Sequence, residues 1–422
     1  MKINPQLEDL KTSLLTQIQS LTGQKSEQEA LNEAATLSFP NSKNEEWKYS
    51  PFSVVKDTNY LVRAGQGLAV GSIPTEDLAD CHLIVFLDGA YNQNLSSKEE
   101  IKGLKIGEIK DFKGFTKSYE HNIFDQLNSS TANISGLSIE VSPKTIIEKP
   151  IVIHHINSQS DSAAWVQPRI QVKVGEKAEV SFAEIWESEG NQTIVSNAVL
   201  EIDVAQSSFV KWFSLEKSNK DSSLVNQTRV EAGEKAVFQH IVVSLGDGYI
   251  RNNLEIKING TQADAHMYGL SLGSARLHVD HHTFVNHKAE NTTSNQLYKS
   301  IFSGKATGVF NGKILVDQVA QKTNAYQSSK NILLSNDAKV YAKPQLEIFA
   351  DDVKCSHGAT IGQLDEEPIF YLRSRGLDEA TAKQMLVQAF ASEILMKISN
   401  NVLHSLFSKE VEAEMERLIQ IN

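Results

Sequence analysis

A cysteine and a histidine two residues apart are the most reactive pair in this sequence of 422 residues. They are Cys355 and His357, within the stretch KCSHGATIGQLDEEPIFYLRSRG at 354–376. On a β-strand, side chains i and i+2 point to the same face, so the thiol and the imidazole would share one space. Two ligands alone do not hold a metal ion, and no nearby residue supplies the orienting third group of a catalytic Cys–His pair. A buried structural cysteine is the competing interpretation.

A second candidate is the histidine-rich segment HVDHHTFVNH at 278–287. If this segment is a strand, His278, Asp280 and His282 lie on one face. Imidazole and carboxylate ligands suit zinc or iron, so these three residues are weak metal candidates. A flat strand face rarely closes a shell of about four ligands. The simpler interpretation is a polar strand face with hydrogen-bonded histidines.

Several classes of function find no support in the rest of the sequence. The segment GVFNGKI at 308–314 is too short for a P-loop and has Ile where Ser or Thr is required, so we expect no ATP hydrolysis by this chain. The formal charge is −11 and no basic patch is present, so nucleic acid is not an expected partner. The N-terminus lacks the apolar core of a signal peptide, and no apolar run is long enough to span a membrane. Together with only two cysteines, this predicts a soluble cytoplasmic protein.

The elements that must position the candidate residues are predicted to be mainly β. Across the middle of the chain, short alternating stretches rich in Val, Ile, Phe and Thr are separated by Gly and Asn. Some stretches resemble one another, as VGEKAEVSF at 174–182 resembles AGEKAVFQH at 232–240. Repeats with variable turn lengths are typical of strand–turn–strand rungs that stack into a β-helix. An array of β-sandwiches is the alternative fold.

This pattern divides the chain into three predicted regions. They are a helical and mixed region at 1–134, a β-helix core at 135–364 and a helical region at 365–422. Within the first region, leucine and isoleucine at helical spacing predict an amphipathic helix over 5–22. No role is assigned to residues 53–130.

The C-terminal region carries clear helix signals. Asp365 and Asp378 are placed to cap two successive helices, and Gly376 is placed to end the first of them. A last helix is predicted near 408–420. These helices have apolar stripes, which are consistent either with an interface or with helices that pack on each other and cap the end of the β-helix. We expect the β-rich part to stay soluble without residues 377–422.

The stretch around Cys355, with KPQLEIFADDV before it and AKQMLVQAFASEIL after Gly376, resembles the C-terminal signature of the SufB/SufD family of iron–sulfur cluster assembly proteins. Three more segments resemble the same family: HVDHHTFVNH, FNGKILV and AQKTNAYQSSKNILLS. NEEWKYS at 44–50 resembles the amino-terminal motif of the SufD branch, and the Ser-His-Gly that follows Cys355 resembles that branch too. The resemblance covers both ends of the chain and most of 260–400.

The resemblance implies a fold and two partners. The fold is a right-handed parallel β-helix with helical N-terminal and C-terminal regions. SufD pairs with SufB, and each holds one copy of the ABC-type ATPase SufC through its C-terminal helices. In this sequence the ATPase-binding region corresponds to Met385, Leu386, Phe390 and Ile394. When the chain is alone, we expect a homodimer through strands near the C-terminal end of the β-helix.

The resemblance also implies a role for the Cys–His pair. Cys355 and His357 become this chain's side of a site for a transient iron–sulfur cluster shared with SufB. His357 is then the possible metal ligand, and Cys355 lines the interface. A reduced flavin is associated with such a complex, although this sequence contains no flavin motif.

Two functions from different classes follow from the sequence. The first is a non-enzymatic assembly scaffold of the SufD type. The alternative is a metal- or carboxylate-dependent β-helix enzyme that acts on a polysaccharide, which calls for a secretion signal and a cleft of paired acids. Neither feature is found in the sequence, and co-purification of an ATPase and a large homologue would distinguish the two.

Overall fold

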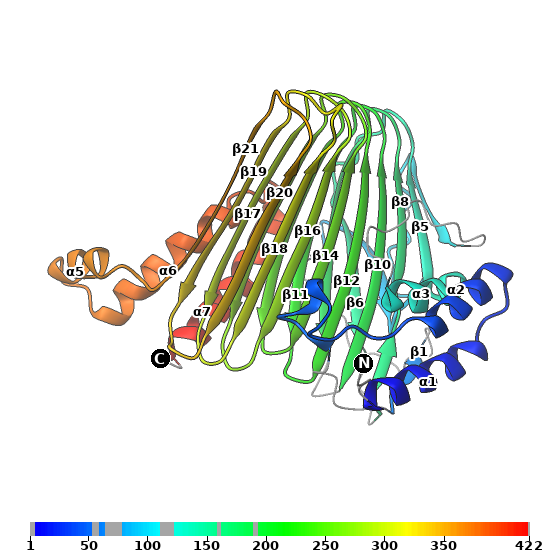
Figure 1. The fold of residues 1–422 in the computed structure, drawn as a ribbon, viewed down its shortest axis with the longest axis horizontal. Coiled ribbons are helices and arrows are strands. Elements are labelled where there is room, and N and C mark those ends of the chain that lie inside the picture. Colours follow the sequence, from blue (N-terminus) through cyan, green and yellow to red (C-terminus); the bar gives the residue numbers. More distant parts are fainter. Residues whose placement is uncertain are drawn as a thin grey trace.

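The fold is a parallel β-solenoid of about eight turns, in which two sheets face each other across a narrow core (Figure 1). The computed structural model describes residues 5–52, 59–63, 78–109, 122–157, 162–188 and 193–420. Each turn adds one strand to each sheet, so most strands pair in parallel with the strand two places later in the sequence. The predicted mainly β fold with helical ends is confirmed.

In the part of the chain that the structure describes, the two sheets contain eleven and ten strands, and we call them the first and the second sheet. The first sheet contains β1 (Leu61–Arg63), β4 (Leu104–Glu108), β5 (Gly136–Val141), β7 (Ala164–Val166), β8 (Arg169–Val174), β10 (Ile194–Val204), β12 (Ser222–Ala232), β14 (Tyr249–Ile258), β16 (His278–His287), β18 (Thr307–Val316) and β20 (Lys339–Ile348). The second contains β2 (His82–Leu87), β3 (Ala90–Tyr91), β6 (Ile151–Asn157), β9 (Glu179–Ser188), β11 (Phe209–Ser218), β13 (Val237–Gly246), β15 (Asp264–Gly273), β17 (Thr293–Phe302), β19 (Asn324–Leu333) and β21 (Lys354–Gly362). Strands within 1–134 therefore already belong to the sheets.

The repeated GEKA segments are the same turn on two rungs of the solenoid. Lys177 and Lys235 both adopt left-handed backbone conformations, with φ of 57° and 54°. Each lies just before a strand of the second sheet. Left-handed backbone is uncommon for residues other than glycine, so its recurrence marks one turn geometry used repeatedly. The repeated sequence therefore indicates that successive rungs stack with the same turn.

The N-terminal helices cover the solenoid beside its first rungs (Figure 1). They are α1 (Pro5–Gln19), α2 (Lys25–Thr36), the short 3-10 helix η1 (Glu45–Trp47), α3 (Ile123–Ser129) and α4 (Ala132–Ser135). Phe39, Phe52 and Phe124 from these segments pack together and against Trp165 on β7. The helix predicted over 5–22 is confirmed, since α1 occupies most of it.

The C-terminal helices are α5 (Glu366–Ser374), α6 (Glu379–Leu395) and α7 (Asn401–Gln420). Asp365 caps α5 by accepting from the N–H of Glu367 at 3.0 Å, and Asp378 caps α6 by accepting from that of Thr381 at 2.9 Å, as predicted. α5 projects away from the sheets together with the start of α6 (Figure 1). Among the described residues, no helix is long and apolar enough to cross a membrane.

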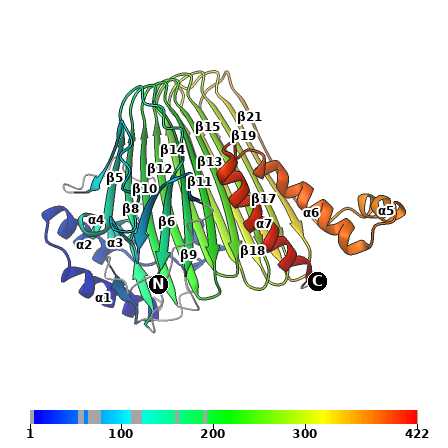
Figure 2. The ribbon, with the colours of Figure 1, turned by 180° about the vertical axis from the view of Figure 1, so that it is seen from behind.

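The rest of α6 and all of α7 lie against the outer face of the second sheet (Figure 2). The shared apolar cluster includes Val387, Ala391, Ile394, Leu403 and Phe407 from the helices and Phe213, Ile241 and Leu270 from the strands. Removing residues 377–422 would expose this strand surface to water. We therefore expect that truncation to aggregate, contrary to the soluble remainder expected from the sequence.

The interior of the solenoid is not purely apolar. Glu216 on β11 is 1% exposed and accepts hydrogen bonds from Ser244 Oγ at 2.6 Å and Asn252 Nδ2 at 2.8 Å. Burial raises the pKa of Glu216 to about 7, and the hydrogen bonds from Ser244 and Asn252 only partly oppose this rise. The Glu216 carboxyl group is therefore about half protonated at neutral pH in the folded chain.

Replacing Glu216 with glutamine should stabilise the protein at alkaline pH. The folded-state pKa is raised from 4.5, so ionisation destabilises the fold progressively as the pH rises from about 4.5 through 7. Above pH 7 this pKa shift lowers the free energy of unfolding by about 3 kcal/mol. The Tm advantage of Glu216→Gln over the parent should be largest at pH 8 and vanish near pH 4. Parallel Tm profiles of the two chains across this range would contradict the assignment.

Candidate functional site

Cys355 and His357 lie on β21, the last strand of the second sheet. β21 pairs in register with β19, where Ala325 is opposite Cys355 and Gln327 is opposite His357. Ala325 and Gln327 are buried, and Cys355 packs against the apolar cluster between the sheets. The two side chains therefore share the inner face of the solenoid. Within the described part of the chain no further rung covers them, so His357 is exposed and Cys355 is half-buried.

The backbone of β21 is an open sheet edge. The N–H of Lys354 donates to the carbonyl of Thr323 at 2.9 Å. Since the backbone groups of successive residues in a strand point to opposite sides, the N–H groups of His357 and Ala359 point away from β19. β20, at the end of the first sheet, contains Pro344, which has no N–H. β21 is thus the uninterrupted edge of the terminal rung, and such an edge is a template for pairing.

Cys355 and His357 differ in how readily each can bind a metal ion. Burial raises the pKa of the Cys355 thiol, and the backbone N–H of Ala325 only partly offsets it. Because this pKa is raised, the isolated chain holds Cys355 as a thiol at neutral pH. The thiolate is the form that binds metal. Both Cys355 and Cys81 are free, and Cys81 is buried. His357 is therefore the more available metal ligand of the pair.

The residues of the histidine-rich strand β16 do share one face, as the sequence indicates. His278 Nε2 lies 2.8 Å from Ser50 Oγ. His282 lies between two carboxylates, with Nε2 3.1 Å from Asp280 Oδ1 and Nδ1 3.4 Å from Glu46 Oε2. Among the described residues, no group of three or more His, Cys, Asp or Glu is arranged to hold a metal ion. The face serves as a docking surface for the N-terminal segment.

We call this segment, Glu45–Ser50, the N-terminal strap. The guanidinium of Arg251 lies 3.7 Å from the centre of the Trp47 ring and donates to Asp280 at 2.7 Å. Tyr49 stacks on Tyr341 of β20 with ring centres 4.3 Å apart. Glu45 forms an ion pair with Lys343 on the same strand. The strap therefore reaches from β14 to the terminal rung, which explains the NEEWKYS motif structurally.

Electrostatics hold the strap in place. Burial opposes the ionisation of Asp280, but His282 and Arg251 overcome it and lower the pKa of this carboxyl. Burial and Arg251 favour neutral His282, but Asp280 and Glu46 overcome both and raise the pKa of its imidazole. This stabilisation is present below the unfolded pKa of His282 and declines as the pH rises through the folded value.

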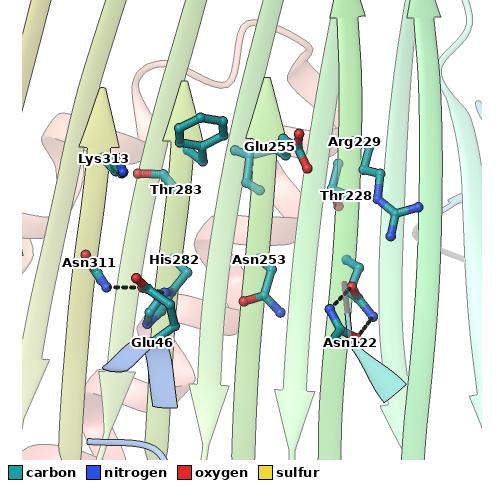
Figure 3. A pocket seen from close by; sticks show the side chains of 13 residues that line it. Glu46, Asn122, Thr228, Arg229, Asn253, Glu255, His282, Thr283, Asn311 and Lys313 are labelled. Atoms are coloured by element: carbon teal, nitrogen blue, oxygen red, sulfur yellow. Dashed lines mark hydrogen bonds and ion pairs between the residues drawn. The ribbon is translucent and has the colours of Figure 1, made fainter. Parts of the chain in front are cut away.

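A polar groove lies on the outer face of the first sheet beside the strap. Figure 3 shows Glu46 on one side and Asn122 on the other, with Asn253 between them. Asn311 donates to Glu46 at 2.8 Å, and Asn122 donates to Gln227 at 3.0 Å. The groove is thus bounded by hydrogen bonds that attach N-terminal segments to the sheet.

The residues expected to bind the ATPase differ in exposure. Met385 is 46% exposed, Leu386 and Phe390 are half-buried, and Ile394 is fully buried against the second sheet. Ile394 therefore supports α6 and cannot contact a docked partner directly. Two residues that the sequence did not single out are more prominent. They are Phe370 and Tyr371 on α5, at 75% and 57% exposure.

A family model described as SUF system FeS cluster assembly, SufBD core domain, matches residues 154–390, more than half of the chain. The chain belongs to the SufBD family. The match includes β21 and most of α6, so both candidate residues lie inside the shared core. The resemblance found in the sequence is confirmed at the level of the family.

Individual SufBD relatives cover most of the chain. The iron–sulfur cluster assembly protein SufD of Escherichia coli (strain K12) is 32% identical over 373 residues, which is 87% of each chain. A SufBD family protein of Synechocystis is 29% identical over 385 residues, 86% of this chain and 84% of the relative. The chloroplastic protein ABCI7 of Arabidopsis thaliana is 31% identical over 263 residues, 60% of this chain and 55% of the relative. This chain is accordingly an iron–sulfur cluster assembly protein of the Suf system.

Proposed function

We propose that this chain is a non-enzymatic scaffold subunit of the SufD type. The observation that carries the proposal is the uncovered terminal rung, where Cys355 and His357 lie on the inner face beside an open strand edge. A partner solenoid that pairs with β21 covers both side chains and adds ligands of its own. The SufD name of the Escherichia coli relative supports this role.

The cargo of the shared site is a nascent iron–sulfur cluster. Thiolates are the usual cluster ligands, and imidazole can replace them on iron. A half-site accounts for the lack of a complete ligand set among the described residues. A cluster with incomplete thiolate ligation is easily released, which suits a scaffold. We assign direct ligation to His357, while Cys355 lines the interface.

The two partners bind at different places. A SufB-like homologue pairs edge to edge with β21, and a second copy of this chain takes its place when the chain is alone. A SufC-like ABC ATPase binds the projecting part of the C-terminal region, where Phe370, Tyr371 and Met385 are exposed. ATP hydrolysis then belongs to that partner, in agreement with the missing P-loop.

The His357→Ala variant tests the shared site in the complex with both partners. Removing the imidazole should lower the iron and acid-labile sulfide retained after reconstitution at least five-fold, because one ligand is lost. Folding and complex assembly should be intact, since His357 is exposed on the last strand of the second sheet. Circular dichroism and size-exclusion chromatography check both points.

Cys355→Ala is the matched control on the same strand face. It should lower cluster content by less than two-fold, since we place this thiol at the lining of the interface. A His357→Ala complex with as much iron and sulfide as the parent, and the same absorbance spectrum, would return His357 to a structural role.

A further inference from the structure

A buried amide with unused hydrogen-bonding capacity lies next to His357. Gln327 on β19 is 3% exposed, and among the described residues neither Nε2 nor Oε1 of its side chain has a hydrogen-bond partner. It is opposite His357 in the register of β19 and β21, on the same inner face. Neighbouring strands are about 4.8 Å apart, so the amide is within reach of the imidazole ring.

The same column continues one rung deeper. Gln296 on β17 is opposite Gln327 and is fully buried. Its Oε1 accepts from Thr283 Oγ1 of the first sheet at 2.6 Å, which anchors this lower amide. Gln296 and Gln327 form a stack of two amides with no hydrogen bond between them, since Gln296 Nε2 and both polar atoms of the Gln327 side chain have no partner among the described residues. The free end of the stack faces His357.

The opposite sheet leaves room for the Gln327 amide. Gly312 on β18 has no side chain, and a Cβ placed there would lie 3.2 Å from Gln327 Nε2. Buried polar groups nearly always have a hydrogen-bond partner, so an amide with none calls for an explanation. A histidine that binds metal through one ring nitrogen almost always donates the N–H of the other to an acceptor. The Gln327 carbonyl oxygen is such an acceptor.

We propose that Gln327 is a positioning residue of the shared cluster site. When a partner covers the terminal rung, Gln327 Oε1 accepts a hydrogen bond from one ring nitrogen of His357, so that the other nitrogen faces the cluster. Gln327 touches no iron itself and acts only through His357. The inference rests on the proposed function of His357.

The Gln327→Met variant tests this role in the complex with both partners. Methionine has nearly the same volume but no hydrogen-bonding amide. The Tm of the isolated variant chain should equal or exceed that of the parent, because an unpartnered buried amide is removed. Cluster content of the complex should nevertheless fall at least three-fold, and the imidazole nitrogen coupling in the electron paramagnetic resonance spectrum of the reduced cluster should change. A merely structural role would instead lower Tm and cluster content together.

Gln296→Met is the control one rung deeper. This variant loses the hydrogen bond that Thr283 Oγ1 donates to Gln296 Oε1, so its Tm should fall. Its cluster content should stay within two-fold of the parent. Three outcomes would overturn the inference for Gln327: parent-level cluster content and an unchanged spectrum in Gln327→Met, a Tm that falls with the content, or an equal loss of cluster in Gln296→Met.

The His357→Ala complex separates the two proposals. If that complex retains its cluster, the shared site itself fails. If it loses the cluster while Gln327→Met retains it, only the role of Gln327 fails.

Discussion

Replacing Ala359 with proline should prevent this chain from pairing through its terminal rung while leaving its own fold intact. The N–H of Ala359 points to the open edge of β21, so proline removes a group that only an added strand would use. The proline ring also blocks close approach of that strand. We expect the affinity for the SufB-like partner, or for a second copy of the chain, to fall at least 100-fold in light scattering and calorimetric titration.

Ala359→Val is the matched control for this edge. Valine keeps the backbone N–H and favours the strand conformation, so pairing should persist. Circular dichroism and Tm of both variants should match those of the parent, since Ala359 is exposed. Undiminished pairing of the proline variant would show that the partner binds away from β21.

Substituting both Phe370 and Tyr371 with serine should abolish capture of the ATPase. These side chains are the most exposed aromatic residues of the C-terminal helices, on a helix that projects from the sheets. Exposed aromatic residues commonly carry most of the binding energy of an interface, so a loss of at least 100-fold in affinity is expected. Co-purification with the tagged ATPase and calorimetric titration measure it. The Asp365 cap and the single buried residue of α5, Ile369, are left intact.

The control for this prediction is Met396→Ser. Met396 is 71% exposed at the C-terminal end of α6, away from α5, so its loss should leave capture within two-fold of the parent. Point variants are preferable to removing residues 377–422, because α6 and α7 cover the outer face of the second sheet. Full capture by the Phe370 and Tyr371 variant would move the ATPase site elsewhere.

Local patterns determined much of this protein. The i, i+2 spacing of Cys355 and His357 placed both on one strand face, because side-chain direction in a strand has a period of two. The GEKA echo revealed stacked rungs, since one turn geometry recurs with the same residues. Asp365 and Asp378 marked two helix starts, because a cap is a contact between residues two or three positions apart. All of these features depend on neighbours in the chain.

Only the tertiary structure shows which strand face, which sheet edge and which helix surface are exposed to a partner and which are buried within the chain. Only the stacking of β21 on β19 shows that the Cys–His face is the inner face of an open rung with Gln327 beside it. His278 is 228 residues from Ser50 in the sequence, so its docking to the strap has no local signal. Ile394 fits an apolar helix stripe as well as Met385 does, and only packing on the second sheet shows that it is buried. Contacts between distant residues depend on how whole elements pack, and periodicity within one element does not encode that choice.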